Sequence, residues 1–181
     1  MPLVAIKYIA NSFALLLFIT ILGGFLHFFI IEFTEINGVS MEPTYIDTQK
    51  VIINKITPLL TPLKRGETVS LFDEYRELLL IKRVVGLPGE QIVIRDGAVY
   101  VRDQFGNENI LTEPYIQNSV LTKPKIGNEE LYPILGPHEY FVLGDNRGRS
   151  TDSRIYGSVD RSQIVGVVFP IPFASSSRAQ N

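Results

Sequence analysis

The chain has 181 residues, enough for one soluble domain of ordinary size and a membrane segment. Its net charge of -2, with acidic and basic residues interspersed, provides no basic field for phosphates, so we expect no nucleic-acid partner. Cysteine is absent and only two histidines are present, which excludes disulfides, cysteine nucleophiles and thiolate or histidine-rich metal sites. We therefore expect neither a metal nor a cofactor.

The first predicted element is a membrane-spanning helix. Residues 13–31, FALLLFITILGGFLHFFII, contain no Asp, Glu, Lys or Arg, and as a helix they span a hydrocarbon core of about 30 Å. A cleavable secretory signal is the alternative, because Lys7 precedes the run. The run is too long for one, and Glu32 and Glu35 stand where a cleavage site with small residues would follow.

The orientation of this helix follows from the charges around it. Lys7 and the amino terminus precede the span, so the positive-inside tendency leaves the amino-terminal end in the cytoplasm. We expect residues 1–33 to form the cytoplasmic end and the anchor, and residues 34–173 to form an extracytoplasmic domain. Residues 174–181 are small and polar, which predicts a disordered tail.

The loop after the anchor, NGVSMEPT (residues 37–44), contains a candidate nucleophile. Ser40 lies between Gly38 and Pro43, and irregular loops of this kind present a hydroxyl and leave backbone N–H groups free. Most serines in such loops form turns or caps, so this segment alone leaves both roles open.

The rest of the chain predicts a mostly β fold. Short apolar and β-branched runs recur between turn residues and lack a helical period: KVIINK, ETVSLF, LLLIKRVV, QIVIRDGAVYV, EYFVLGD and QIVGVVF. The pair Asp96-Gly97 is a two-residue turn that predicts a hairpin. We expect an antiparallel, sheet- or barrel-like catalytic domain. Residues 103–137, which are polar and poorly periodic, are predicted to be a variable excursion from its core.

Lys82 lies within the apolar run LLLIKRVV. A lysine in such a run either extends to the surface or is buried. Burial lowers the pKa of a lysine because it disfavours the charged form, and only a lysine with a much lowered pKa acts as a base near neutral pH. An edge-strand lysine that opposes aggregation is the alternative at this point.

The loop GDNRGRSTDSRIYG, residues 144–157, is the third segment that can carry chemistry. It holds three arginines, two aspartates and two serines, and it follows the predicted strand EYFVL. One interpretation is a solvated loop with Asp/Arg pairs. The other is a loop that holds a site, because such dense sets of donors and acceptors at strand ends often do.

Four segments, in this order behind an amino-terminal anchor, resemble the motif series of bacterial type I signal (leader) peptidases, which are Ser/Lys-dyad serine peptidases: SMEPT, RGETVSLF, KRVVGLPGE and GDNRGRSTDSRIYG. The resemblance implies that Ser40 is the nucleophile and Lys82 the general base. It also implies that the Ser150 hydroxyl orients the lysine, and that Asp152 and Arg154 hold the site together.

Asp145 falls on the GDNR portion of the motif, where the resemblance implies a structural, supporting role. Ile36, Met41 and Ile81 are apolar neighbours of the two dyad positions, and we expect them to line a shallow substrate pocket. Some family members have a serine two residues before the nucleophile, where Gly38 stands here. The oxyanion hole is then expected to use the Ser40 backbone N–H and another donor.

The resemblance implies a membrane-bound endopeptidase that removes N-terminal signal peptides by acyl-enzyme hydrolysis. Its substrates are exported preproteins with small residues at the first and third positions before the cut. The expected location is a bacterial cell membrane, or a thylakoid membrane, crossed once, with the catalytic domain on the extracytoplasmic side. The lipid bilayer is then a partner, and the secretion translocon a possible one.

Two other interpretations remain at this stage. One is a specialised Ser/Lys processing peptidase, including the self-cleaving repressor type, although the anchor and the lack of a basic recognition helix argue against a DNA-bound repressor. The other is a non-catalytic, membrane-anchored β domain that binds peptides in an export complex. A Ser/His/Asp site is disfavoured, because His27 lies in the membrane segment and His138 is a predicted turn residue.

Overall fold

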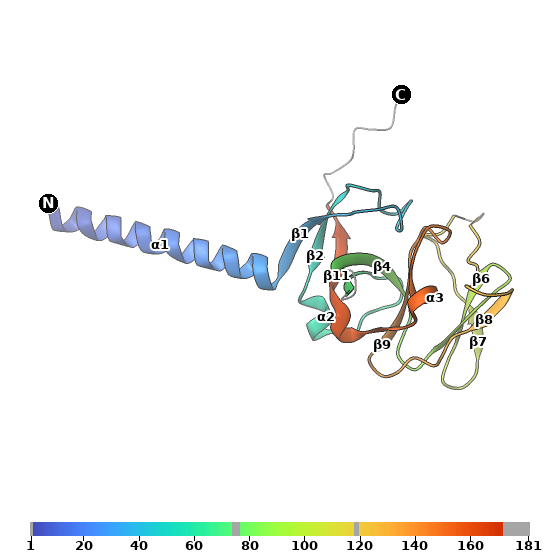
Figure 1. Cartoon of the computed structure of the whole chain (residues 1–181). Coiled ribbons are helices and arrows are strands. Elements are labelled where there is room, and N and C mark those ends of the chain that lie inside the picture. The colour runs from blue at the N-terminus through green and yellow to red at the C-terminus, as the bar shows by residue number, and fades with distance from the viewer. Residues whose placement is uncertain (1, 74–76, 118–119, 172–181) are drawn as a thin grey trace, which may run out of the picture.

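The computed structural model describes residues 2–73, 77–117 and 120–171. Its first element is the helix α1 (Pro2–Phe29), which extends away from the rest of the molecule (Figure 1). Residues Ile6–Leu26 of this helix are long and apolar enough to cross a membrane. The predicted disordered tail, 174–181, lies outside the described residues.

The body of the protein consists of two antiparallel sheets, which confirms the predicted fold class. The first has seven strands in the order β1-β2-β11-β3-β4-β9-β10, and the second has four in the order β7-β6-β5-β8. The strands of the first sheet are β1 (Ile31–Glu35), β2 (Lys50–Asn54), β3 (Thr68–Asp73), β4 (Leu78–Gly86), β9 (Glu139–Leu143), β10 (Val159–Asp160) and β11 (Ile164–Pro170). Those of the second are β5 (Gln91–Arg95), β6 (Ala98–Arg102), β7 (Glu108–Ile110) and β8 (Glu129–Leu131). The described residues of the body also form the short helices α2 (Thr57–Leu60), α3 (Ser153–Tyr156) and the 3-10 helix Arg161–Gln163.

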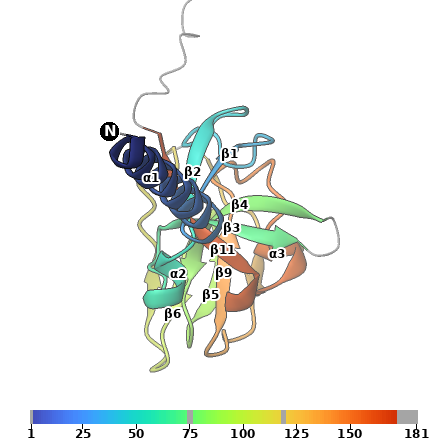
Figure 2. The ribbon, with the colours of Figure 1, turned by 90° about the vertical axis from the view of Figure 1, so that its left-hand side faces the viewer.

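The first sheet adjoins α1, and the second lies at the far end of the molecule (Figure 1). In the view along α1, the helix projects from the side of the body where β1 and β2 lie (Figure 2). Strand β1 begins at Ile31, one residue after the turn that ends the helix, and pairs with β2. The predicted apolar run therefore ends in a strand that the sequence analysis did not anticipate.

The predicted hairpin is confirmed. Strands β5 and β6 pair on either side of Asp96 and Gly97, whose φ angles are 51° and 78°. Two central residues with positive φ give the turn whose twist matches that of the strands it joins.

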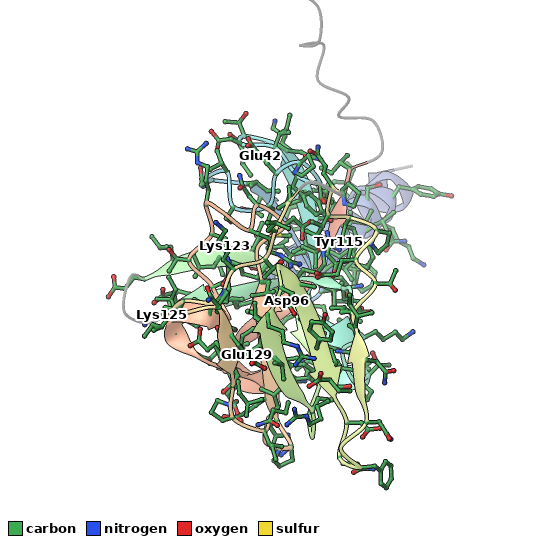
Figure 3. All side chains as sticks on the ribbon, turned by 90° about the vertical axis from the view of Figure 1, so that its right-hand side faces the viewer. Glu42, Asp96, Tyr115, Lys123, Lys125 and Glu129 are labelled. Carbon is green, nitrogen blue, oxygen red and sulfur yellow. The ribbon has the colours of Figure 1, made fainter. Side chains whose placement is uncertain are left out.

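The excursion at residues 103–137 contributes edge strands to the second sheet, since β7 pairs with β6 and β8 pairs with β5. Between these two strands the Tyr115 ring lies over Arg83 of β4, and the chain then passes the turn between β5 and β6. There Thr122 N donates to Gly97 O at 2.8 Å, at the turn of the hairpin. Figure 3 shows this side of the molecule, with Asp96 at the hairpin turn and Tyr115 and Lys123 in the segment between β7 and β8.

Three hydrophobic clusters form the core, and one of them lies behind the predicted nucleophile loop. Its buried members are Ile36, Met41, Tyr45, Val51, Ile53 and Val168, and Ile81 packs against them. Because Met41 follows Ser40 and Ile81 precedes Lys82, this cluster anchors both predicted catalytic segments.

Candidate active site

Ser40 lies in the loop between β1 and β2, and the loop that follows β9 holds its backbone in place. Asn146 N donates to Ser40 O at 3.0 Å, and Asn146 Nδ2 donates to Val39 O at 3.0 Å. Met41, the next residue, is buried in the core. Asn146 therefore holds the backbone of Val39 and Ser40, and the burial of Met41 holds the chain on the other side of Ser40.

Lys82 reaches Ser40 from the neighbouring part of the same sheet. Its Nζ atom lies 2.9 Å from Ser40 Oγ and donates to Ile81 O at 2.9 Å. Only 3% of the residue is exposed, and the rest of β4 after it is buried as well. Burial disfavours the charged ammonium relative to the neutral amine. The structure thus brings the two predicted catalytic side chains into hydrogen-bond contact.

Arg83 and Asp145 form a buried ion pair beside the dyad. Arg83 Nε donates to Asp145 Oδ1 at 2.8 Å and Arg83 Nη2 to Asp145 Oδ2 at 2.5 Å. Burial alone would lower the pKa of Arg83, but the hydrogen bonds and negative charge of Asp145 outweigh it, so the pKa is raised. The Tyr115 ring covers the guanidinium, with its centroid 4.0 Å from Arg83 Cζ. This pair ties the strand of Lys82 to the loop that holds Ser40.

Asp152 and Arg154 form a second buried pair, in the same loop as Asp145. Arg154 Nε donates to Asp152 Oδ1 at 2.8 Å, and Gly144 N donates to Asp152 Oδ2 at 3.0 Å. Arg154 Nη2 also donates to Arg147 O at 2.8 Å. Asp152 therefore organises the turn between β9 and α3, and neither side chain of the pair is hydrogen-bonded to the dyad.

Ser150 lies close to the nucleophile, but its hydroxyl makes no hydrogen bond. Its Oγ is buried, and within the described part of the chain it has no hydrogen-bond partner. The contact with Lys82 that the resemblance implies is therefore not formed in this structure. A Cβ built on Gly144 would lie 2.2 Å from Ser150 Oγ and 2.5 Å from Ser40 O, so the two serines approach each other across Gly144.

This close approach makes Gly144 sensitive to substitution. We expect Gly144→Ala to lower kcat/KM for preprotein cleavage by about 100-fold, because displacing a catalytic group by about 1 Å has that effect. It should also lower the free energy of unfolding by about 1–3 kcal/mol through overpacking. Gly148→Ala is the matched control in the same loop, since a Cβ there meets nothing within 4 Å. Equal activity in the two variants would contradict the prediction.

Contacts of the excursion also reach the loop after β9. Arg147 Nη1 donates to Glu113 Oε2 at 2.9 Å, and the guanidinium also contacts Thr122. Arg154 Nη1 donates to Lys123 O at 3.3 Å. Glu113, Thr122 and Lys123 therefore contact the loop that holds the nucleophile, a role that the sequence analysis missed.

A cavity of about 460 Å³ adjoins the dyad. Its walls come from the end of β1 and the residues after it, from the nucleophile loop and from strands β2, β3 and β4: Thr34, Glu35, Ile36, Asn37, Ser40, Met41, Ile53, Ser70, Leu78, Leu79, Leu80, Ile81 and Lys82. Ile36, Met41 and Ile81, the three predicted pocket residues, all lie on these walls. The cavity has both apolar and polar walls, and Ser40 and Lys82 are among the residues that line it.

A second, more open cavity of about 550 Å³ lies between α2 and the turn before β9. It is larger, but neither Ser40 nor Lys82 lines it. We therefore place the candidate site at the smaller cavity. Among the described residues, no group of three or more His, Cys, Asp or Glu side chains lies together as a metal site would require.

The comparisons with known proteins identify the family. The model of the family described as signal peptidase, peptidase S26, matches residues 9–172. The chain belongs to this family. Membership confirms the predicted family, the serine-peptidase class and the removal of signal peptides as the activity.

Two relatives that are more than 30% identical to the chain give the same result. The chain is 33% identical to signal peptidase I T of Bacillus subtilis (strain 168) over 151 residues, 78% of this chain and 76% of that protein. It is 35% identical to signal peptidase I V of the same strain over 142 residues, 74% of this chain and 81% of that protein. The crystal structure of a signal peptidase I from Enterococcus faecalis V583 aligns at 25% identity with a TM-score of 0.49, covering 60% of this chain and 98% of that chain.

Proposed function

We propose that this chain is a membrane-anchored endopeptidase that cuts signal peptides from exported preproteins, with Ser40 as nucleophile and Lys82 as general base. The contact that carries the proposal is the 2.9 Å distance between Lys82 Nζ and Ser40 Oγ, formed by a lysine that is only 3% exposed. A nucleophile within hydrogen-bond reach of a buried base is the arrangement that covalent catalysis requires.

The reaction proceeds in two halves. Neutral Lys82 takes the proton of Ser40 as Oγ attacks the scissile carbonyl, and the resulting ammonium gives a proton to the departing amine. The product is an ester of Ser40 and a free new amino terminus. Lys82 then takes a proton from water as the water attacks the ester, and returns it to Ser40 Oγ, which restores the enzyme.

The Ser40 backbone N–H is the first donor to the developing oxyanion. Among the described residues it donates no hydrogen bond, so it is available to a substrate oxygen. The Gly38 N–H is already used, because it donates to Asp47 Oδ1 at 2.6 Å. Glycine at this position therefore supplies neither a hydroxyl nor a free amide, and the second donor comes from elsewhere in the site.

The pocket accounts for small substrate residues at the first and third positions before the cut. In an extended peptide these two side chains point to the same face, about 7 Å apart. A cavity of about 460 Å³ that also contains the peptide backbone leaves room for side chains of alanine size. Ile36, Met41 and Ile81 supply its apolar walls.

The anchor sets where this site works. The helix α1 spans the membrane with Lys7 on the cytoplasmic side, so the sheets lie on the extracytoplasmic side of a bacterial cell or thylakoid membrane. Only ten residues separate the end of α1 at Phe29 from Ser40, which holds the dyad close to the lipid surface. Exposed apolar side chains near the helix and the cavity, such as Phe33, Leu78 and Leu79, fit that surface. A secretion translocon is a natural neighbour for such a site.

A serine-directed acylating inhibitor tests the nucleophile directly. We expect mass spectrometry of the full chain in detergent to find one adduct, located on Ser40, and preprotein cleavage to stop as the adduct forms. Ser40→Ala should lose both the adduct and the cleavage. Ser162→Ala, which removes an exposed serine hydroxyl, should keep both. A folded chain that forms no adduct and cuts no preprotein would instead be a peptide-binding domain.

A further inference from the structure

The oxyanion that forms at the scissile carbonyl needs more donors than the nucleophile itself supplies. Such an oxygen accepts more than one hydrogen bond, and the Ser40 backbone N–H provides only one. Gly38 provides none, because it has no side chain and its N–H donates to Asp47. A second donor must therefore come from another group beside the dyad. The cavity that Ser40 and Lys82 line is where such a group would meet the substrate.

Asn37 carries an amide that is available at this place. Among the described residues that line the cavity, it has the only side-chain amide, and it lies three positions before Ser40 in the same loop. The residue is exposed, and its amide has no hydrogen-bond partner within the described part of the chain. An amide nitrogen has two N–H donors, so this group is free to donate to a substrate oxygen.

The other side-chain donors on the cavity walls are less suited to this role. They belong to Thr34, Ser40, Ser70 and Lys82. Ser40 and Lys82 exchange the proton of the reaction, so neither is available to hold the oxyanion. Ser70 is 0% exposed, so its hydroxyl does not reach a bound peptide. Thr34 lies within β1, six positions before Ser40, whereas Asn37 belongs to the nucleophile loop.

The backbone on both sides of Asn37 is held by hydrogen bonds. Ile36 N donates to Gln49 O at 2.9 Å, which ties the preceding residue to the chain before β2. Gly38 N donates to Asp47 Oδ1 at 2.6 Å, which ties the following residue to the same stretch. Donors that are fixed before the reaction stabilise a developing charge without reorganisation. Only the side-chain torsions of Asn37 have to adjust when a substrate binds.

We propose that the Asn37 side-chain amide donates the second hydrogen bond to the oxyanion. When Ser40 Oγ bonds to the scissile carbon, the electron pair of the carbonyl moves to its oxygen. The Asn37 N–H and the Ser40 backbone N–H then share that charge. Because the charge is absent from the bound substrate, Asn37 lowers the barrier more than it tightens binding. This assignment rests on the proposed function and adds a catalytic residue to it.

Three variants of Asn37 test the assignment, using the full chain in detergent with one preprotein. Asn37→Ala should lower kcat about 100-fold with little change in KM, because it removes a donor that acts in the transition state. Asn37→Asp has nearly the same shape, but it loses the N–H groups and its charge repels the oxyanion, so kcat should fall further. Asn37→Gln keeps the donor on a longer side chain and should recover part of the kcat that Asn37→Ala loses.

Thr34→Val is the matched control, because it removes another donor from the same cavity with little change in shape. Its kcat and KM should equal those of the wild type. A peptide aldehyde gives a second measurement, since it adds the Ser40 hydroxyl across its carbonyl to form a hemiacetal. The former carbonyl oxygen then lies where the oxyanion forms. Its inhibition constant should rise in Asn37→Ala but not in Thr34→Val.

The outcomes separate this assignment from the proposed function on which it rests. An unchanged kcat in Asn37→Ala and Asn37→Asp would overturn the assignment and leave the proposed function standing. A raised KM with an unchanged kcat would also overturn it, because Asn37 would then only bind the substrate. A wild-type chain that cuts no preprotein would overturn the proposed function first.

Discussion

Lys82→Met is expected to lower kcat for preprotein cleavage by about 10⁴-fold, because it removes the group that takes the proton from Ser40. Methionine has a similar length and fills the same buried space, but it cannot accept a proton. Lys82 is only 3% exposed, and a buried amine costs more free energy than a buried apolar side chain of similar size. The fold should therefore be retained. The measurement is single-turnover cleavage of a preprotein by the full chain in detergent, alongside its circular dichroism spectrum.

The control for this variant is Lys64→Met, which removes an exposed lysine outside the cavity and should keep full activity. Activity in Lys82→Met above about a tenth of that of the wild type would remove Lys82 from the mechanism. Loss of activity in His138→Ala alone would point to a different base.

Local sequence signals predicted the parts of this fold that depend on neighbouring residues. Asp96-Gly97 specifies its turn through two residues with positive φ, so the hairpin of β5 and β6 follows from the sequence. The apolar run around Lys82 predicts a strand, and β4 is buried from Lys82 to its end. The strand β1 was missed because only Ile31 and Phe33 of its five residues are apolar, which is too short a pattern to indicate a strand.

Contacts between distant segments could not be predicted in this way. Ser40 and Lys82 are 42 positions apart, and only the resemblance to a family indicated that they meet. The ion pair of Arg83 and Asp145 joins residues 62 positions apart. Arg83 directly follows the buried Lys82 on β4, and nothing in the neighbouring sequence indicates that its partner is Asp145. Glu113 and Thr122 lie in a polar segment that appeared variable, since the arginine that both contact, Arg147, is 34 and 25 positions away.

Asp145→Ala is expected to lower the free energy of unfolding by about 3–5 kcal/mol, because it leaves the Arg83 guanidinium buried without its counter-charge. The side chains of the pair are 9% and 0% exposed, so water cannot replace the lost carboxylate without rearrangement. The chain has no tryptophan, so urea unfolding is best followed by circular dichroism. Asp160→Ala, which removes an exposed carboxylate, is the control and should change stability far less.

The double variant Arg83→Met/Asp145→Leu separates the two roles of this pair. It buries no charge, so we expect it to recover most of the stability that Asp145→Ala loses. Its activity should stay low, because the pair ties the strand of Lys82 to the loop whose Asn146 holds Ser40. A double variant that recovers both stability and cleavage would show that the pair only fills space. A loss below about 1 kcal/mol in Asp145→Ala would show instead that water reaches Arg83.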